Sequence, residues 1–328
     1  MDARVNKQRL GNLLSYDWLK ILVAIAAAVF ALVMFFTMVR TKPTRAQKFI
    51  IHAYGGLNGG EDFVVLEDAV KKIVSYDTLK IKVESFSSDS NSSASYTARR
   101  SSGEGSVMFV ANYSKPDKNE NPTKTPLENI MHIGIQDEGV YGFEKLTMFH
   151  EADTFMADCE KYLIRFFGQE WRTSEIDRAE AEACFRARNV TGPNNKHRYK
   201  TKAQIARGIE DEITRLETLR EDYIYIMDEG FGKGMLSYTN YVSDVSERDE
   251  NGEITEKHEN VYCVGVSLAK LSTKISESLL YYVDADGKKV ANELNLLFYN
   301  NGPKLEDMKY EAITFLRYLM DKYSDKRA

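Results

Sequence analysis

The sequence predicts a single membrane-spanning helix followed by a folded domain of the α/β class. Two observations predict this arrangement. An apolar run extends from Leu19 to Val39 and carries only one charge, Lys20, at its edge. Behind it, residues 49–111 read as strand, helix, strand, helix and strand. Such alternation is typical of α/β units with a parallel sheet.

The membrane-spanning helix is predicted from Trp18 to Val39. The part from Ile21 onwards would be about 28 Å long as a helix, close to the thickness of the hydrocarbon layer. Trp18 stands where an interfacial aromatic residue is expected. A cleaved signal peptide is the alternative, but the run is long for one and no A-x-A-like site follows it. The lipid bilayer is therefore the first expected partner.

The charges are distributed unevenly along the chain. Residues 1–48 carry eight Lys/Arg and two Asp/Glu, a net charge of +6. The whole chain has a net charge of -5, which leaves -11 for residues 49–328. An acidic body is the opposite of what nucleic-acid binding requires, so we expect no nucleic-acid partner. The basic residues flanking the apolar run are balanced, four before and four after, so the positive-inside rule gives no orientation.

The first half of the domain should build the parallel strands. We expect strands at 49–54, 78–86 and 106–111, the last one wholly apolar from Val107 and suited to a buried position. The first two strands should be joined by a glycine-rich turn (55–60) and a helix at 62–74. The second and third should be joined by a Ser-rich loop (87–95) and a short helix (96–102).

The second half mixes helices and hairpins. Helical periodicity predicts helices at 143–167, 175–188, 202–220 and 305–323. Gly208 lies inside the third of these, at a cost of about 1 kcal/mol relative to alanine. Asn251-Gly252 predicts a hairpin between 235–248 and 254–266, and Asp286-Gly287 predicts another between 281–283 and 288–291. Residues 294–299 should form a last strand.

No motif in the chain indicates catalysis, a metal or a cofactor. The glycine-rich turn is neither G-x-G-x-x-G nor a Walker A sequence. Asp284-x-Asp286-Gly287 resembles the start of a calcium loop, but the rest of that pattern is absent, so a hairpin turn is expected. The five histidines lack ligand spacing. We therefore expect a protein that is not an enzyme, and an exported hydrolase remains the alternative because catalytic groups can be scattered along a chain.

Ligand-binding candidates lie mainly where predicted strands end. In open α/β sheets, ligands bind beyond the carboxyl ends of the strands, and aromatic rings can stack on a sugar or another planar solute. The alternative is that these aromatic residues belong to the core or to the ordinary surface. The candidates are Tyr54, Gly55, Asn58, Tyr113, Trp171 and Tyr238.

The three cysteines leave two interpretations open. Cys159 and Cys184 could form a disulfide if the domain is exported. The alternative is three inert thiols, with Cys263 in the core because it lies in the strand-like run VYCVGV.

Three segments together resemble an extracellular solute-binding protein of the kind that serves bacterial ABC importers. FIIHAYGG (49–56) is similar to the first strand of such proteins and the Tyr-Gly turn after it. SSGEGSVMFVANY (101–113) is similar to the loop that enters their buried third strand, and NNGPKLEDMKYEAITFLRYLMDKY (300–323) to their late strand, loop and helix. The two ends of the domain carry the resemblance, and the middle carries little of it.

The resemblance implies a periplasmic-binding-protein-like domain of two α/β lobes at 49–328. The lobe boundary would lie near 140–150, and the chain would return to the first lobe near 290–328. Residues 1–17 would be a cytoplasmic tail, 18–39 a single-pass signal anchor in the cell membrane, and 40–48 a linker to an extracytoplasmic domain. The domain is short for the family, and a transmembrane helix replaces the usual lipid anchor or cleaved signal.

The implied function is capture of a small polar solute, such as a sugar, between the lobes. The captured solute could serve an ABC permease, or the protein could act as a sensor. The alternative is an interaction or assembly module of the cell membrane, with a degenerate cleft and another membrane protein as its partner.

Overall fold

The computed structural model describes residues 11, 18–39, 43–44, 47–87, 90–101, 104–113, 123–137, 144–192, 199–248, 254–300 and 310–324. The chain divides into two compact units, Met1–Lys42 and Pro43–Ala328.

The first unit contains the helix α2 (Trp18–Val39), which has the predicted bounds. It is apolar on every face, and none of its residues from Trp18 to Phe35 is buried. A core helix of a soluble domain would be largely covered by the rest of the protein. By length and composition, α2 is therefore able to span a membrane.

The second unit is built on a mixed sheet. Among the residues described, it has six strands in the order β3-β1-β4-β11-β8-β7. The strands β1, β3 and β4 are parallel, as the alternation in the sequence predicts. The strand β11 then runs antiparallel to β4, and β8 and β7 continue the antiparallel half. The bounds are β1 (Lys48–Tyr54), β3 (Lys80–Phe86), β4 (Val107–Ala111), β7 (Ser237–Arg248), β8 (Ile254–Ser267) and β11 (Leu294–Phe298).

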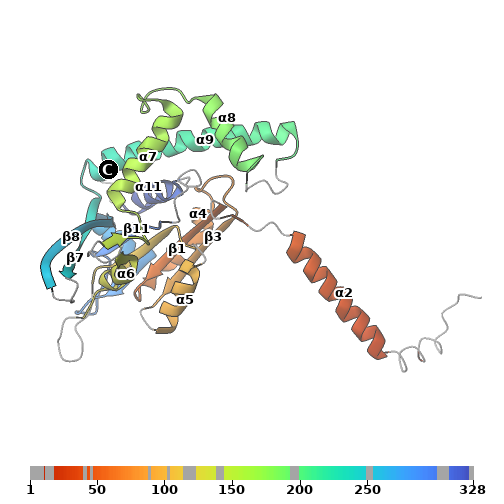
Figure 1. Ribbon diagram of the computed structural model, residues 1–328, viewed down its shortest axis with the longest axis horizontal. Helices are drawn as coiled ribbons and strands as arrows, with labels where there is room; N and C mark the ends of the chain where they lie inside the picture. The colour runs from red at the N-terminus through yellow and green to blue at the C-terminus, as the bar shows by residue number, and fades with distance from the viewer. Residues whose placement is uncertain are drawn as a thin grey trace, which may run out of the picture. The chain divides into compact units, whose positions relative to one another are not determined.

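Helices cover both faces of the sheet (Figure 1). Alternate residues of β4 divide between the two faces: Val107, Phe109 and Ala111 belong to the larger core, and Met108 and Val110 to the smaller. This explains why the strand is apolar throughout. The larger core lies under α7 (Ala152–Phe167), α8 (Arg178–Asn189), α9 (Lys202–Tyr225) and α11 (Glu311–Tyr323). The smaller core lies under α5 (Ser90–Ser101) and α6 (Pro126–Gly134).

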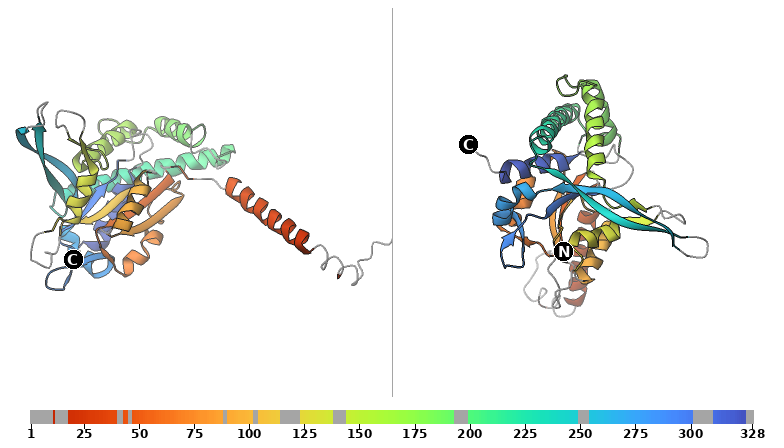
Figure 2. Two further views of the ribbon diagram at one scale, coloured as in Figure 1. Left: turned by 60° about the horizontal axis from the view of Figure 1, so that its bottom comes forward. Right: turned by 90° about the vertical axis from the view of Figure 1, so that its left-hand side faces the viewer.

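The strand pairing of both predicted hairpins is confirmed, and the connecting residues 249–253 of the first lie outside the described residues. The strands β7 and β8 form a long antiparallel hairpin that runs out past the other strands of the sheet (Figure 2). The strands β9 (Leu280–Val283) and β10 (Lys289–Val290) form the second, and β9 also pairs with β2 (Asn58–Gly59). A two-stranded sheet joins β5 (Ile135–Asp137) to β6 (Glu144–Leu146).

Several predicted boundaries were wrong. The predicted helix at 62–74 is two short helices, α3 (Glu61–Val64) and α4 (Leu66–Val70). The helix α5 begins inside the predicted Ser-rich loop. The helix predicted from 143 begins only at Ala152, and α11 begins at Glu311, the predicted positions 305–309 lying outside the described residues.

Short helical turns complete the chain. The π-helical turn η2 (Ile226–Phe231) extends α9 beyond its predicted end at residue 220. Between β8 and β9 the chain forms η3 (Ala269–Leu271), α10 (Ser272–Lys274) and η4 (Ile275–Leu279). The hydroxyl side chains of Ser272, Thr273 and Ser276 in these turns line one hollow with Tyr113 and Tyr282.

Candidate functional site

The candidate site is a hollow of about 520 Å³ that we name the carboxyl-edge hollow. It lies where β4 ends and β11 begins: Tyr113 follows β4, and the backbone N–H of Asn112 donates to the carbonyl of Glu293 at 2.9 Å. Its remaining described lining comes from residues 272–276, after β8, and 282–293, around the β9–β10 hairpin. The hollow therefore occupies the position, beyond a parallel strand's carboxyl end, where open α/β sheets bind ligands.

Two stacked tyrosines form one wall of the hollow. The rings of Tyr113 and Tyr282 are 4.5 Å apart between centroids, with 22° between their planes. Tyr282 is buried, and its hydroxyl donates to Oδ1 of Asn292 at 2.7 Å. This bond and the stack hold both rings in place, so an apolar surface is ready before any ligand arrives.

Polar groups form the rest of the described lining. Hydroxyls come from Ser272, Thr273 and Ser276. Carboxylates come from Asp284, Asp286 and Glu293, and the amide from Asn292. An aromatic surface beside a few hydrogen-bonding groups is the usual composition of a small-molecule site.

The β9–β10 turn sets the position of Asp284. One of its carboxylate oxygens accepts from the backbone N–H of Lys288 at 2.8 Å, and Gly287 has the positive φ, 82°, that the turn requires. The prediction of a hairpin turn at this motif is confirmed. Among the described residues, no group of three or more His, Cys, Asp or Glu side chains could hold a metal ion.

The structure does not bring the six predicted ligand-binding residues together. Tyr113 lines the carboxyl-edge hollow. Asn58 is exposed in β2, directly opposite Tyr281 and thus beside the strand that carries Tyr282. Tyr54 lies in the smaller core, with its ring 5.6 Å from that of Tyr96.

The other three predicted residues have local structural roles. Gly55 adopts φ 86°, and a side chain there would meet Pro126 at the start of α6. Trp171 is buried in the larger core, where its indole N–H donates to Glu160 at 3.2 Å. Tyr238 stacks on Phe231 with ring centroids 4.6 Å apart.

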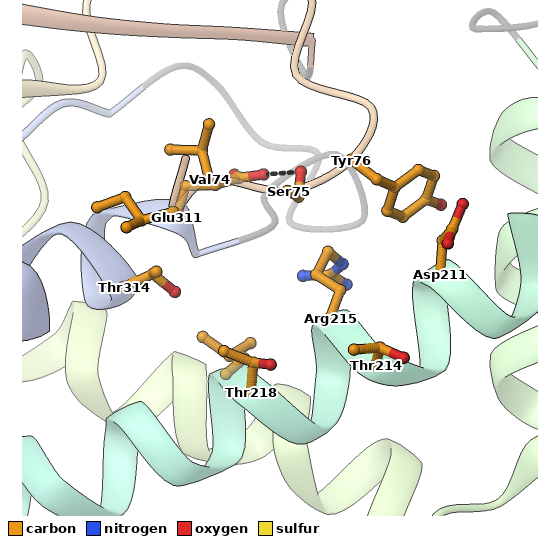
Figure 3. Close-up of a pocket in the computed structure, with 11 residues that line it drawn as sticks. Val74, Ser75, Tyr76, Asp211, Thr214, Arg215, Thr218, Glu311 and Thr314 are labelled. Carbon is orange, nitrogen blue, oxygen red and sulfur yellow. Dashed lines mark hydrogen bonds between the residues drawn. The ribbon is translucent and has the colours of Figure 1, made fainter. Parts of the chain in front are cut away.

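A second hollow, of about 240 Å³, lies between α9 and α11 and is shown in Figure 3. Ser75, Thr218 and Thr314 turn toward it, with Arg215 at its centre. The hydroxyl of Ser75 donates to Glu311 at 2.5 Å. We name this the α9–α11 hollow.

The charge beside the α9–α11 hollow is neutralised by neighbouring residues. Arg215 donates to both carboxylate oxygens of the fully buried Glu212, at 2.8 and 3.2 Å, and to the hydroxyl of Tyr162 at 2.7 Å. Arg188 donates to Glu212 at 2.6 Å, and its Nε lies 3.8 Å from Asp77. This buried cluster joins α7, α8 and α9 to the loop before β3, which is a structural role.

The buried cluster also changes the acidity of its members. Burial by itself would raise the pKa of Glu212, but Arg215 and Arg188 outweigh burial and lower this pKa to about 2. Glu212 therefore stays ionised, and its charge is fully used within the protein. This is why we place the candidate site at the carboxyl-edge hollow instead.

Of the two interpretations left open for the cysteines, the structure shows free thiols at Cys159, Cys184 and Cys263. Cys159 is fully buried, and burial raises the pKa of its thiol well above the ordinary value. Burial likewise raises the pKa values of Cys184 and Cys263. Raised pKa values make these thiols poor nucleophiles.

Comparison with protein families, with characterised proteins and with solved structures finds no match for this chain. The resemblance of the two ends of the domain to solute-binding proteins thus stays an interpretation of the sequence.

Proposed function

We propose that this chain is a membrane-anchored binding protein that captures a small polar solute in the carboxyl-edge hollow. The observation that carries the proposal is the Tyr113–Tyr282 stack, which lines one hollow together with hydroxyl, amide and carboxylate groups. Ring faces supply buried area at little cost in entropy, and the polar groups would select the solute by its hydrogen bonds.

The proposed anchor is α2, with residues 1–17 in the cytoplasm and residues 49–328 outside the cell membrane. The length and apolar surface of α2 support anchoring. The orientation rests on the resemblance to solute-binding proteins, because the flanking charges are balanced. A permease of the ABC type, or another membrane protein, would then receive the solute or the signal.

The two-lobed arrangement is the alternative form of this proposal, because α7, α8 and α9 contribute none of the described lining of the carboxyl-edge hollow. In it, the helices α7, α8 and α9 would be a reduced second lobe, since they lie between the expected boundary near 140–150 and the expected return near 290. Small-angle scattering with and without solute tests this point. Closing lobes would lower the radius of gyration on binding, whereas capture in a surface hollow would leave it unchanged.

The function itself is tested with the full chain in lipid nanodiscs. Sugars, short peptides and polyamines are screened by thermal shift, because a ligand of the folded state raises the unfolding temperature by mass action. We expect one class to stabilise the protein and Tyr113→Ala to abolish the shift. The matched control is Tyr238→Ala, which removes a tyrosine that also stacks on another ring. Silence across the whole panel would overturn the proposal.

A second candidate function, the interaction or assembly module, is favoured by one observation. Val242 and Val261 are paired on the outermost hairpin of the sheet and are 49% and 60% exposed. Exposed apolar side chains on an edge strand are suited to contact with another protein. Crosslinking in membranes separates the two functions: a stable protein partner that is lost on Val242→Lys, without any solute binding, would favour assembly.

A further inference from the structure

The carboxyl-edge hollow has a strongly one-sided charge. Its described lining has the three carboxylates of Asp284, Asp286 and Glu293, and within that lining there is no Lys, Arg or His. The solute proposed above must be compatible with this charge. An anionic solute would face like charges and gain no opposite charge in return.

None of the lysines that lie near the hollow in the sequence is among its described lining residues. Lys270 and Lys288 are exposed, and two others make contacts elsewhere. Nζ of Lys274 donates to the carbonyl of Ser324 at 2.6 Å, at the end of α11. Nζ of Lys289 lies 4.5 Å from the ring centre of Tyr281, whose neighbour Tyr282 lines the hollow. Successive residues of a strand point to opposite faces, so Lys289 is directed away from the ring of Tyr282.

The tyrosine stack adds a second and independent preference for positive charge. The face of an aromatic ring attracts a cation through its quadrupole, and the attraction grows as the cation loses water. Burial raises the pKa of Tyr282 to about 12, although a hydrogen bond with the backbone of Glu293 acts to lower it, and the negative charges of Glu293 and Asp284 act in the same direction as burial. A positive charge between ring and carboxylates would be attracted by both.

We infer that the solute is a compact organic cation that carries an ammonium group. This inference rests on the proposed function and names the chemical class of its ligand. The ammonium group would lie against Tyr113, between the ring and the carboxylates of Asp284 and Glu293, with N–H groups or hydroxyls of the solute bonded to Ser272, Ser276 and Asn292. A hollow of about 520 Å³ fits a small molecule.

The test is titration calorimetry on the full chain in phosphatidylcholine nanodiscs. The probes are two cations (choline and spermidine), one neutral sugar (glucose) and one anion (glycerol 3-phosphate). We expect at least one cation to bind at least tenfold more tightly than glucose, with no binding of the anion. Raising the salt concentration should weaken the cation's binding several-fold, because exposed carboxylates are screened.

Variants locate the binding at the hollow. Asp284→Asn combined with Glu293→Gln should raise the Kd of the cation at least tenfold, and asparagine can still accept the turn hydrogen bond of Lys288. Glu217→Gln removes an exposed carboxylate on α9 and should leave the Kd unchanged. Unfolding temperatures without ligand show that each variant is folded.

The outcomes separate the inference from the proposed function. Binding of glucose or glycerol 3-phosphate that is lost on Tyr113→Ala would leave the proposed function intact. It would overturn the inference that the solute is a cation. Binding of a cation that the double variant does not weaken would overturn the assignment to this hollow. No binding of any probe would overturn the inference, and the wider solute panel then decides whether the proposed function fails with it.

Discussion

At the scale of single residues, Glu212 is a buried carboxylate that depends on its neighbours for charge compensation. It is fully buried on α9 and accepts hydrogen bonds from Arg188, Arg215 and Tyr76. Burying a carboxylate is costly unless such partners surround it, and removing one member of the set leaves uncompensated charge.

We therefore expect Glu212→Gln to lower the free energy of unfolding by about 3–5 kcal/mol. Two guanidinium groups would remain, with Asp77 near Arg188 as the nearby counter-charge. Chemical denaturation of the full chain in detergent measures the change. Glu217→Gln, at an exposed position of the same helix, should change it by less than about 0.5 kcal/mol. Equal effects of the two substitutions would contradict this account.

The pH dependence of Glu212 has a definite sign. Its folded-state pKa, about 2, lies below its ordinary value, so its contribution is present above pH 4.5 and is lost as the pH falls toward 2. The wild type should lose stability across this range more steeply than Glu212→Gln. Parallel acid-unfolding curves would show that Glu212 is not the group responsible.

Residue type alone does not reveal whether an aromatic residue lies in the core or lines the hollow. Tyr54 and Trp171 were expected at a ligand, and both are buried in a core. Tyr282, Asn292 and Glu293 line the hollow and were not among the candidates. The expected strand at 294–299, which begins beside them at this edge of the sheet, was the signal that could have found them.

At the scale of elements, the contact between α8 and α9 depends on Gly208. A side chain at this position would meet the rings of Phe185 and Tyr199. The sequence suggests only a cost for glycine in a helix, whereas the structure shows why glycine is needed: it lets the ring of Phe185 approach α9.

Gly208→Ala should therefore destabilise the protein by about 1–3 kcal/mol, even though alanine favours the helix by about 1 kcal/mol. Thermal unfolding of the full chain measures it. The control is Ala206→Gly at an exposed position of the same helix, which should cost about 1 kcal/mol through helix propensity alone. A gain in stability for Gly208→Ala would refute close packing at this contact.

The contact between α9 and α11 contains a carboxylate, Asp222, whose pKa is shifted in the direction opposite to that of Glu212. Burial raises the pKa of Asp222 to about 6, although Thr314 and Arg317 act to lower it. A raised folded-state pKa means that the contribution of Asp222 to stability is greatest below about pH 3.8 and falls as the pH rises through 6.

Asp222→Asn should thus stabilise the protein at pH 8 by about 1–3 kcal/mol and have little effect at pH 4. Denaturation midpoints at both pH values test this expectation, with Glu217→Gln as the control. A stabilisation of equal size at pH 4 and pH 8 would mean that the charge of Asp222 is not its cause.

The helix α6 shows a local signal that was missed. No helix was expected between residues 113 and 143, yet Thr125 and Glu128 form a capping box with proline at the first helical position. The pattern T-P-x-E is a helix start in its own right. Pro116 and Pro122 precede this pattern and favour a loop, so the helix start was not recognised.

At the scale of the whole molecule, the orientation of the second unit across the membrane decides between the functions considered. The proposed extracytoplasmic domain can be tested by labelling intact cells with a membrane-impermeant thiol reagent. Glu217→Cys provides an exposed thiol, in a background with Cys184→Ser and Cys263→Ser, and Cys159 stays because it is buried.

We expect the same labelling of Glu217→Cys before and after the cells are made permeable. The parent background without this cysteine should remain unlabelled throughout. Labelling that requires permeable cells would place the domain in the cytoplasm and remove the resemblance to solute-binding proteins as a guide to its function.

The sequence by itself determined the features that depend on local periodicity. The bounds of α2 follow from an unbroken apolar run, and the parallel strands β1, β3 and β4 follow from alternating element patterns. The strand pairing of the two hairpins follows from the Asn-Gly and Asp-Gly pairs in the sequence. The tertiary structure alone decided which side chains meet. Tyr113 and Tyr282 are 169 positions apart and stack although Tyr113 follows β4 of the six-stranded sheet and Tyr282 lies in β9 of the three-stranded sheet. No local pattern encodes that contact, since it depends on how the two sheets pack together.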